Sequence, residues 1–270
     1  MTLTDIADLT AECEELDVLL DRLPPQTWAQ TTAFFSWTIA DQIMHLRLVD
    51  DFAATSAGAP VRFPSLVAEV RAGQARGIEL SAVMRARYGA LAPAALHAAW
   101  HQGWRDVCAL LARSDAAARL PWFGPEMSAQ ALADARQMEV WAHGQDIYDC
   151  CRLRRPRHER IRRICALGVR TQGWSFRNRG LERPAPPQLQ LCGPDGSIWT
   201  SNEGATERIT GDAEDFALVV TQRRHVDDTS LIIHGAHARH WMEIAQCFAG
   251  KPETGPTAGE RIVPNAQTFV

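Results

Sequence analysis

Four long stretches in the first part of the chain repeat apolar side chains every three or four residues. This spacing places the apolar side chains on one face of an α-helix. A Pro-Pro pair ends the first stretch, Gly58 ends the second, and Ser36 or Thr38 can cap the start of the second. Four amphipathic helices joined by loops bury their apolar faces against one another, so the sequence predicts a four-helix bundle. The stretches are residues 4–23, 36–58, 93–114 and 128–151.

The pattern changes after a fifth predicted helix, residues 157–176. A Pro-rich connector is followed by apolar residues that alternate on both sides of Pro-Asp-Gly, which is typical of a β-hairpin. Two short strands and two helices follow in the same part of the chain. The expected fold is therefore mainly α, with a smaller α+β domain after the bundle. The expected divisions are a bundle at 1–180, the α+β domain at 183–255 and a tail at 256–270.

Composition excludes several classes of protein. The net charge is −4, whereas domains that bind nucleic acid are typically basic. No apolar run reaches the roughly 20 residues of a transmembrane helix. The N-terminal residues are acidic where a signal peptide carries Lys or Arg, so we expect a cytoplasmic protein. The seven Cys are scattered without a CxxC pair, which indicates reduced thiols.

The fourth predicted helix carries a pair of residues that can bind a metal ion. Glu139 and His143 lie four residues apart, so their Cβ atoms are about 5–6 Å apart on one helix face. A third ligand would have to come from another helix, and His45 in the second predicted helix turns with the buried residues. Spacing alone leaves two other interpretations open: a solvated surface pair, and a core histidine that has found a partner. His97 and His101 form a competing pair at the same spacing.

The three candidate ligands lie in two segments, FSWTIADQIMHLRLVDDFA (35–53) and RQMEVWAHGQDIYD (136–149). Their pattern resembles the DinB-like metal-binding bundles, especially the mycothiol-dependent maleylpyruvate isomerases. The resemblance covers about residues 5–150 and is closest to a less characterised metal-binding branch of that superfamily. The matching positions are Trp37, Asp41, His45, Leu46 and Asp50 in the first segment and Arg136, Glu139, His143 and Asp146 in the second.

The resemblance implies that His45, Glu139 and His143 hold a divalent ion, commonly zinc. Two nitrogens and one carboxylate oxygen also suit Fe, Ni or Mn. Three protein ligands leave a position open, which is the arrangement of catalytic rather than structural zinc sites. Asp146 is expected either to orient a ligand imidazole or to pair with an arginine. Trp37 and Trp141 flank the ligands and are expected either to wall the substrate pocket or to be plain core residues.

The family also implies a reaction. Its members use a low-molecular-weight thiol, such as mycothiol, so we expect a thiol-dependent isomerase or transferase that acts on a small, anionic electrophile. The second domain is expected to contribute an anion-binding arginine, with Arg223 and Arg224 as candidates; the alternative for both is a solvated helix end. A metal-dependent hydrolase or lyase would use the same three metal ligands with water in place of the thiol. A third interpretation is a non-catalytic metal-binding protein whose bundle forms a homodimer.

Overall fold

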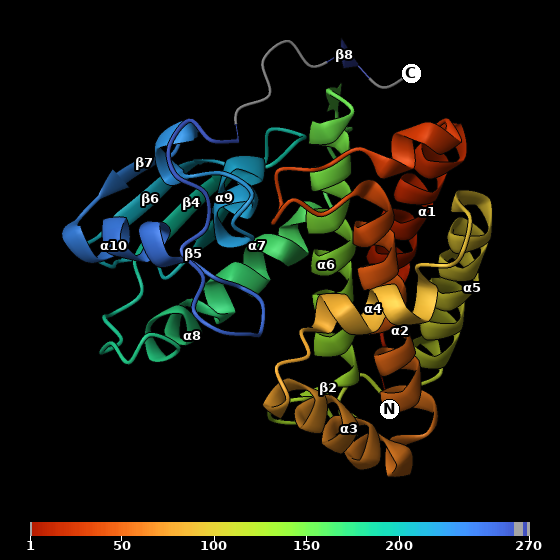
Figure 1. Cartoon of the computed structure of the whole chain (residues 1–270). Coiled ribbons are helices and arrows are strands. Elements are labelled where there is room, and N and C mark those ends of the chain that lie inside the picture. The colour runs from red at the N-terminus through yellow and green to blue at the C-terminus, as the bar shows by residue number, and fades with distance from the viewer. Residues whose placement is uncertain (1, 262–266, 269–270) are drawn as a thin grey trace. The chain divides into compact units, whose positions relative to one another are not determined.

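The structure, a computed structural model, describes residues 2–261 and 267–268. It forms two compact units, residues 1–150 and 151–270. Figure 1 shows the first unit in red to light green and the second in green to blue. In the part of the chain that the structure describes, no helix combines the length and the hydropathy needed to span a lipid bilayer.

The first unit is built around four long helices, α1 (Ala7–Arg22), α2 (Ile39–Gly58), α5 (Pro93–Ala112) and α6 (Ala129–Cys150). They run side by side in Figure 1, and both α1 and α2 pack against α5 and α6. The apolar faces read from the sequence meet in the middle of this bundle. This confirms the predicted mainly α fold. Among the buried predicted positions are Leu9, Leu16, Leu19, Leu20, Ile39, Ile43, Leu46, Phe52, Leu96, Trp100, Trp104, Val107 and Leu111.

The start of α2 is set by a reciprocal pair of hydrogen bonds. The backbone N–H of Asp41 donates to the Thr38 hydroxyl at 3.1 Å, and the Thr38 N–H donates to the Asp41 carboxylate at 2.9 Å. Thr38 is therefore the N-cap, rather than the alternative Ser36. The cap places His45 about two turns inside the helix.

Two helices between α2 and α5 were not predicted, α3 (Phe63–Ala75) and α4 (Leu80–Tyr88). Both are poorly buried: α3 buries only Phe63 and Gly73, and α4 buries only Met84 and Tyr88. Their apolar faces are too narrow to produce a clear helical period. α4 nevertheless packs against α2.

The second unit is a four-stranded sheet with helices, as the predicted smaller α+β domain requires. The strand order is β5-β4-β6-β7, and within this sheet the β4–β6 pair is parallel and the other two pairs are antiparallel. The predicted hairpin is the β4–β5 pair, whose turn contains Gly196 with a φ of 83°. The elements are α7 (Ile161–Arg170), α8 (Gln172–Arg177), β4 (Gln188–Cys192), β5 (Ile198–Ser201), β6 (Arg208–Asp212), α9 (Ala213–Val220), β7 (Ile232–His234) and α10 (Ala236–Ile244).

The structure differs from the sequence expectation in where the units divide. The division falls after Cys150, whereas the expected bundle extends to 180. The reason is that α7 packs against α9 of the second unit. Gly168 permits this approach, because a Cβ there would lie 2.9 Å from Val220. The single helix expected at 157–176 is two helices, α7 and α8, which meet at Thr171. The tail expected at 256–270 lies partly outside the described residues.

Candidate metal centre

His45, Glu139 and His143 lie together inside the bundle. His45 comes from α2, and the other two come from α6. One carboxylate oxygen of Glu139 is 3.2 Å from Nε2 of His45 and 3.4 Å from Nε2 of His143. The three ligand atoms lie within 4.8 Å of one another. Among residues 2–261 and 267–268, this is the one group of three or more His, Cys, Asp or Glu side chains whose ligand atoms gather so closely.

Gln42 holds His143 in a defined orientation. Its amide oxygen is 2.5 Å from Nδ1 of His143, and its amide nitrogen donates to the Thr32 hydroxyl at 2.8 Å. An amide oxygen only accepts hydrogen bonds, so Nδ1 of His143 carries the proton. In the neutral ring Nε2 then has the free lone pair, and it is Nε2 that faces Glu139. Gln42 was not among the residues predicted from the sequence, although its place three residues before His45 puts both on one helix face.

Aromatic rings from the loop before α2 pack against both imidazoles. The ring of Trp37 lies 6.1 Å from that of His143 and nearly parallel to it, and 5.4 Å from the ring of His45. Phe34 meets His143 edge-on at 5.2 Å and Trp37 at 5.3 Å. Trp37 is half-buried, whereas Trp141 on α6 is 4% exposed. Trp37 therefore walls one side of the site, and a role of either Trp in substrate binding stays a prediction.

The donor set calls for a cation. Burial alone would raise the pKa of the Glu139 carboxyl, but the two imidazoles beside it, His143 and His45, favour its charged form and hold that pKa well below its usual range. Nδ1 of His45 is buried without a hydrogen-bond partner. An arrangement in which two imidazole nitrogens face one carboxylate oxygen is stabilised by a proton or a metal ion between them. Two nitrogens and one oxygen are a donor set that zinc accepts in catalytic sites, so the residues fit the ion that the family implies.

Two acids of the motifs have partners of their own. Asp50 accepts hydrogen bonds from Nε of Arg136 at 3.2 Å and from Nη2 of Arg136 at 2.9 Å, and both side chains are buried. This pair links α2 to α6 beside the site. Asp41 belongs to the cap of α2 and also accepts from Nε of Arg85 at 2.7 Å. Burial opposes ionisation of Asp41, but the bonds from Arg85 and Thr38 lower its pKa.

The remaining predicted site residues lie as follows. Asp146 is buried, and its carboxylate is 3.8 Å from Nδ1 of His143, where Gln42 is the closer partner. Its role in orienting His143 stays a prediction. Arg223 and Arg224 follow the C-terminal end of α9 in the second unit. Arg223 is buried and donates to the Thr221 carbonyl, so one of its contacts belongs to the helix end. Anion binding by either arginine stays a prediction.

The competing pair on α5 has a different partner. Nε2 of His97 and Nδ1 of His101 lie 2.8 Å and 2.9 Å from the same oxygen of Asp17 on α1. The carboxylate itself occupies the space between the two rings. This arrangement holds α1 to α5 through hydrogen bonds.

Fold and site together define a class: mainly α proteins with a candidate centre of two histidines and one glutamate inside a four-helix bundle. The family model described as the mycothiol maleylpyruvate isomerase N-terminal domain matches residues 9–148. The chain belongs to this family.

Relatives extend the match beyond the bundle. Two uncharacterised proteins of Mycobacterium tuberculosis, MT0041 of strain CDC 1551 / Oshkosh and Rv0036c of strain ATCC 25618, are each 40% identical to this chain over 252 residues. The matches cover 93% of this chain and 97% of each relative. The similarity therefore includes the second unit as well as the bundle.

Solved structures agree with the fold. The crystal structure of the mycothiol-dependent maleylpyruvate isomerase matches with a TM-score of 0.53 and 12% identity, over 98% of this chain and 95% of that one. The structure of a mutant of that isomerase matches with a TM-score of 0.52 and the same identity and coverage. At this identity the likeness shows a shared fold.

Proposed function

We propose that this protein is a metal-dependent enzyme that uses a low-molecular-weight thiol, mycothiol or a similar compound. Its reaction would be the isomerisation of a small, anionic electrophile or the transfer of the thiol to it. The observation that carries the proposal is the convergence of His45, Glu139 and His143 in a chain of the mycothiol maleylpyruvate isomerase family. The thiol and the isomerase class come from the printed names of the family and of the similar structures.

Each residue of the centre has a role in this proposal. His45 and His143 would bind a divalent ion through Nε2, and Glu139 through the oxygen that both rings face. Zinc is the first candidate, with Fe, Ni and Mn as alternatives. A divalent ion with an open position lowers the pKa of a bound thiol and polarises a carbonyl group.

The surroundings of the centre suit this chemistry. Gln42 keeps the proton of His143 on Nδ1, so Nε2 stays available as a donor atom. The low pKa of Glu139 keeps its carboxylate charged at neutral pH. Trp37 and Phe34 keep water away from one side of the imidazoles. A thiol-dependent enzyme of this kind would act in the cytoplasm on a small molecule, without a nucleic acid or membrane partner.

The first test is the metal content of the purified wild type beside His45→Ala. About one zinc or similar ion per chain in the wild type, lost in the variant, would support the site. His97→Ala is the matched control, because His97 is also a helical histidine with a carboxylate partner and lies outside the centre. Circular dichroism establishes that all three proteins keep their helices. A wild type that binds no metal after incubation with zinc, iron, nickel and manganese in turn would end the proposal.

The second test separates the thiol reaction from chemistry with water. The metal-loaded protein is incubated with maleylpyruvate, with and without mycothiol. Turnover that requires the thiol supports the isomerase or transferase, whereas thiol-independent consumption supports a hydrolase or lyase. Full metal content without turnover of any electrophile would indicate a metal-binding protein without catalytic activity, and its oligomeric state would then show whether the bundle forms a homodimer.

A further inference from the structure

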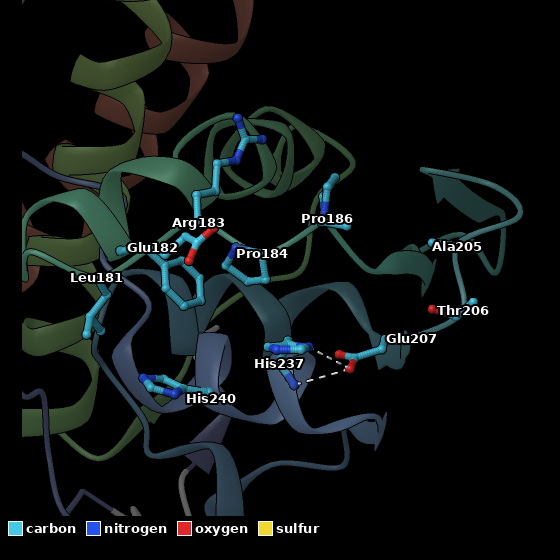
Figure 2. A pocket seen from close by; sticks show the side chains of 12 residues that line it. Leu181, Glu182, Arg183, Pro184, Pro186, Ala205, Thr206, Glu207, His237 and His240 are labelled. Atoms are coloured by element: carbon cyan, nitrogen blue, oxygen red, sulfur yellow. Dashed lines mark hydrogen bonds and ion pairs between the residues drawn. The ribbon is translucent and has the colours of Figure 1, made fainter.

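The second unit contains a cavity that the metal centre does not use. Its volume is about 530 Å³, within the range of roughly 300–1,000 Å³ that small-molecule pockets occupy. Figure 2 shows it between the loop 181–186, the segment 205–207 and helix α10. All of its lining residues belong to the second unit.

The ionisable side chains of the lining are two carboxylates, Glu182 and Glu207, two imidazoles, His237 and His240, and one guanidinium, Arg183. Figure 2 shows the Glu182 carboxylate on the side of the loop that faces the cavity and the Arg183 guanidinium on the other side. Nε of Arg183 donates to the Gln172 side chain at 2.8 Å, so one of the donors of this cation already has a partner. Pro184 and Pro186 have no N–H group, so the loop offers few backbone donors.

The floor of the cavity adds further acceptors. His237 and His240 lie three residues apart on α10, so they share one helix face, and both line the cavity. Nδ1 of His237 is 3.1 Å from Glu207, whose carboxylate also accepts the backbone N–H of Ala238 at 2.6 Å. Because a carboxylate only accepts, Nδ1 of His237 donates, and Nε2 of the neutral ring is an acceptor.

Apolar side chains supply the rest of the lining. Phe176 is buried, and its ring lies 5.6 Å from that of His240. Leu181, Pro184 and Pro186 add apolar surface on the loop. A ligand can therefore place an apolar body against the loop and Phe176 while its polar end reaches the acceptors.

We propose that this cavity binds an amphipathic organic amine. An ammonium group has only donors, and it would find the Glu182 carboxylate and the imidazole nitrogens of His237 and His240. A carboxylate ligand would instead face two carboxylates, Glu182 and Glu207, and the one cation of the lining, Arg183, already donates through Nε to Gln172. Within the described residues, the ligand atoms here do not gather as those of a metal site do.

The test uses 2-phenylethylamine and two matched compounds with the same ring, 2-phenylethanol and 3-phenylpropionate. Isothermal titration of the full-length protein should show binding of the amine that is at least about tenfold tighter than that of either control, since only the amine carries the positive charge. Equal binding of the amine and the carboxylate, or no binding of the amine at millimolar concentration, would overturn the proposal.

Three variants place the binding at this cavity. Glu182→Gln should weaken binding of the amine by roughly threefold to tenfold, the range expected for loss of an exposed ion pair. Glu203→Gln, an exposed acid outside the lining, should leave binding unchanged. Ala205→Trp places a large side chain in the lining and should abolish binding by occupying the cavity. Amine binding that survives both Glu182→Gln and Ala205→Trp at full strength would contradict the proposed site.

Discussion

Gln42 on α2 and His143 on α6 are joined by a hydrogen bond of 2.5 Å between the Gln42 amide oxygen and Nδ1 of His143. The bond fixes which ring nitrogen of His143 carries the proton and connects the two helices that provide the candidate metal ligands. It extends to the loop before α2, because Gln42 also donates to Thr32, whose hydroxyl donates to the Trp37 carbonyl at 2.8 Å. The loop, α2 and α6 therefore position the centre together.

Removal of this bond should weaken metal binding without removing a ligand. Gln42→Ala leaves His143 free to rotate and to change tautomer, so we expect zinc affinity to fall by about 10–100-fold. Competition with a chelator of known affinity measures the change. Gln145→Ala is the control. It removes another buried glutamine, whose hydrogen-bond partner Asp149 lies on the same helix, and should keep the wild-type affinity for zinc. Equal losses in both variants would indicate a general effect of buried glutamines on folding.

Metal loading should stabilise the first unit. An ion that binds only the folded chain raises the free energy of unfolding by about 2.7 kcal/mol at a free concentration of 100 times Kd. Zinc should therefore raise the Tm of the wild type and leave that of His143→Ala unchanged. Differential scanning calorimetry with and without a chelator measures both. A similar zinc-induced shift in the variant would place the ion elsewhere.

The buried pair of Asp50 and Arg136 predicts a dependence of stability on pH. Burial raises the pKa of Asp50 to about 6, although Arg136 acts in the opposite direction. The folded state therefore binds this proton more tightly than the unfolded state, whose carboxyl has a pKa of about 3.9. The stabilising contribution is complete below about pH 4 and is lost as the pH rises through 6, a change of about 3 kcal/mol.

Asp50→Asn removes the titration and tests this sign. Between pH 4 and pH 7 the wild type should lose about 3 kcal/mol of unfolding free energy that the variant does not lose. The difference, variant minus wild type, should therefore increase by that amount. Urea denaturation at several pH values measures it. Asp106→Asn on the exposed side of α5 is the control. A difference between Asp50→Asn and wild type that is constant with pH would show that Asp50 does not titrate in this range.

Trp37 should matter for substrate more than for metal. It offers no ligand atom, but its ring packs against both imidazoles. Trp37→Ala should keep the metal content and lower kcat/KM by about 2–10-fold, the range expected for lost aromatic contacts. Trp141→Phe, which keeps a buried ring, should have a smaller effect. Loss of metal in Trp37→Ala would instead assign the ring to the support of the ligands.

Substitutions of Arg223 and Arg224 should have different effects. Arg223 is buried and bonded to Thr221, so Arg223→Ala should lower stability. Arg224 is only half-buried. If it contributes to anion binding, Arg224→Ala should raise KM for an anionic substrate by about tenfold with little change in Tm. An unchanged KM in Arg224→Ala would remove this residue from the substrate site.

The local sequence pattern was sufficient to predict the elements that bury a wide apolar face. The four bundle helices follow from apolar spacing, and the β4–β5 hairpin follows from Pro-Asp-Gly between alternating apolar residues. α3 and α4 bury few residues, so their periodicity is weak and they were missed. Spacing made Glu139, His143 and His45 candidates, and the resemblance of the two segments that contain them to one family favoured a metal site over a surface pair or a core histidine.

The sequence by itself determined the class of fold, because apolar spacing is a property of single helices, and it indicated the family and the three candidate ligand residues through two motifs that resemble that family. Tertiary structure alone decided which partner each polar group found. Gln42 rather than Asp146 is the closest partner of His143 Nδ1, Asp50 pairs with Arg136, and Asp17 lies between His97 and His101. Such pairs join helices far apart in the chain, and their choice depends on how the helices rotate and shift against one another. Helical periodicity specifies a face but not that rotation.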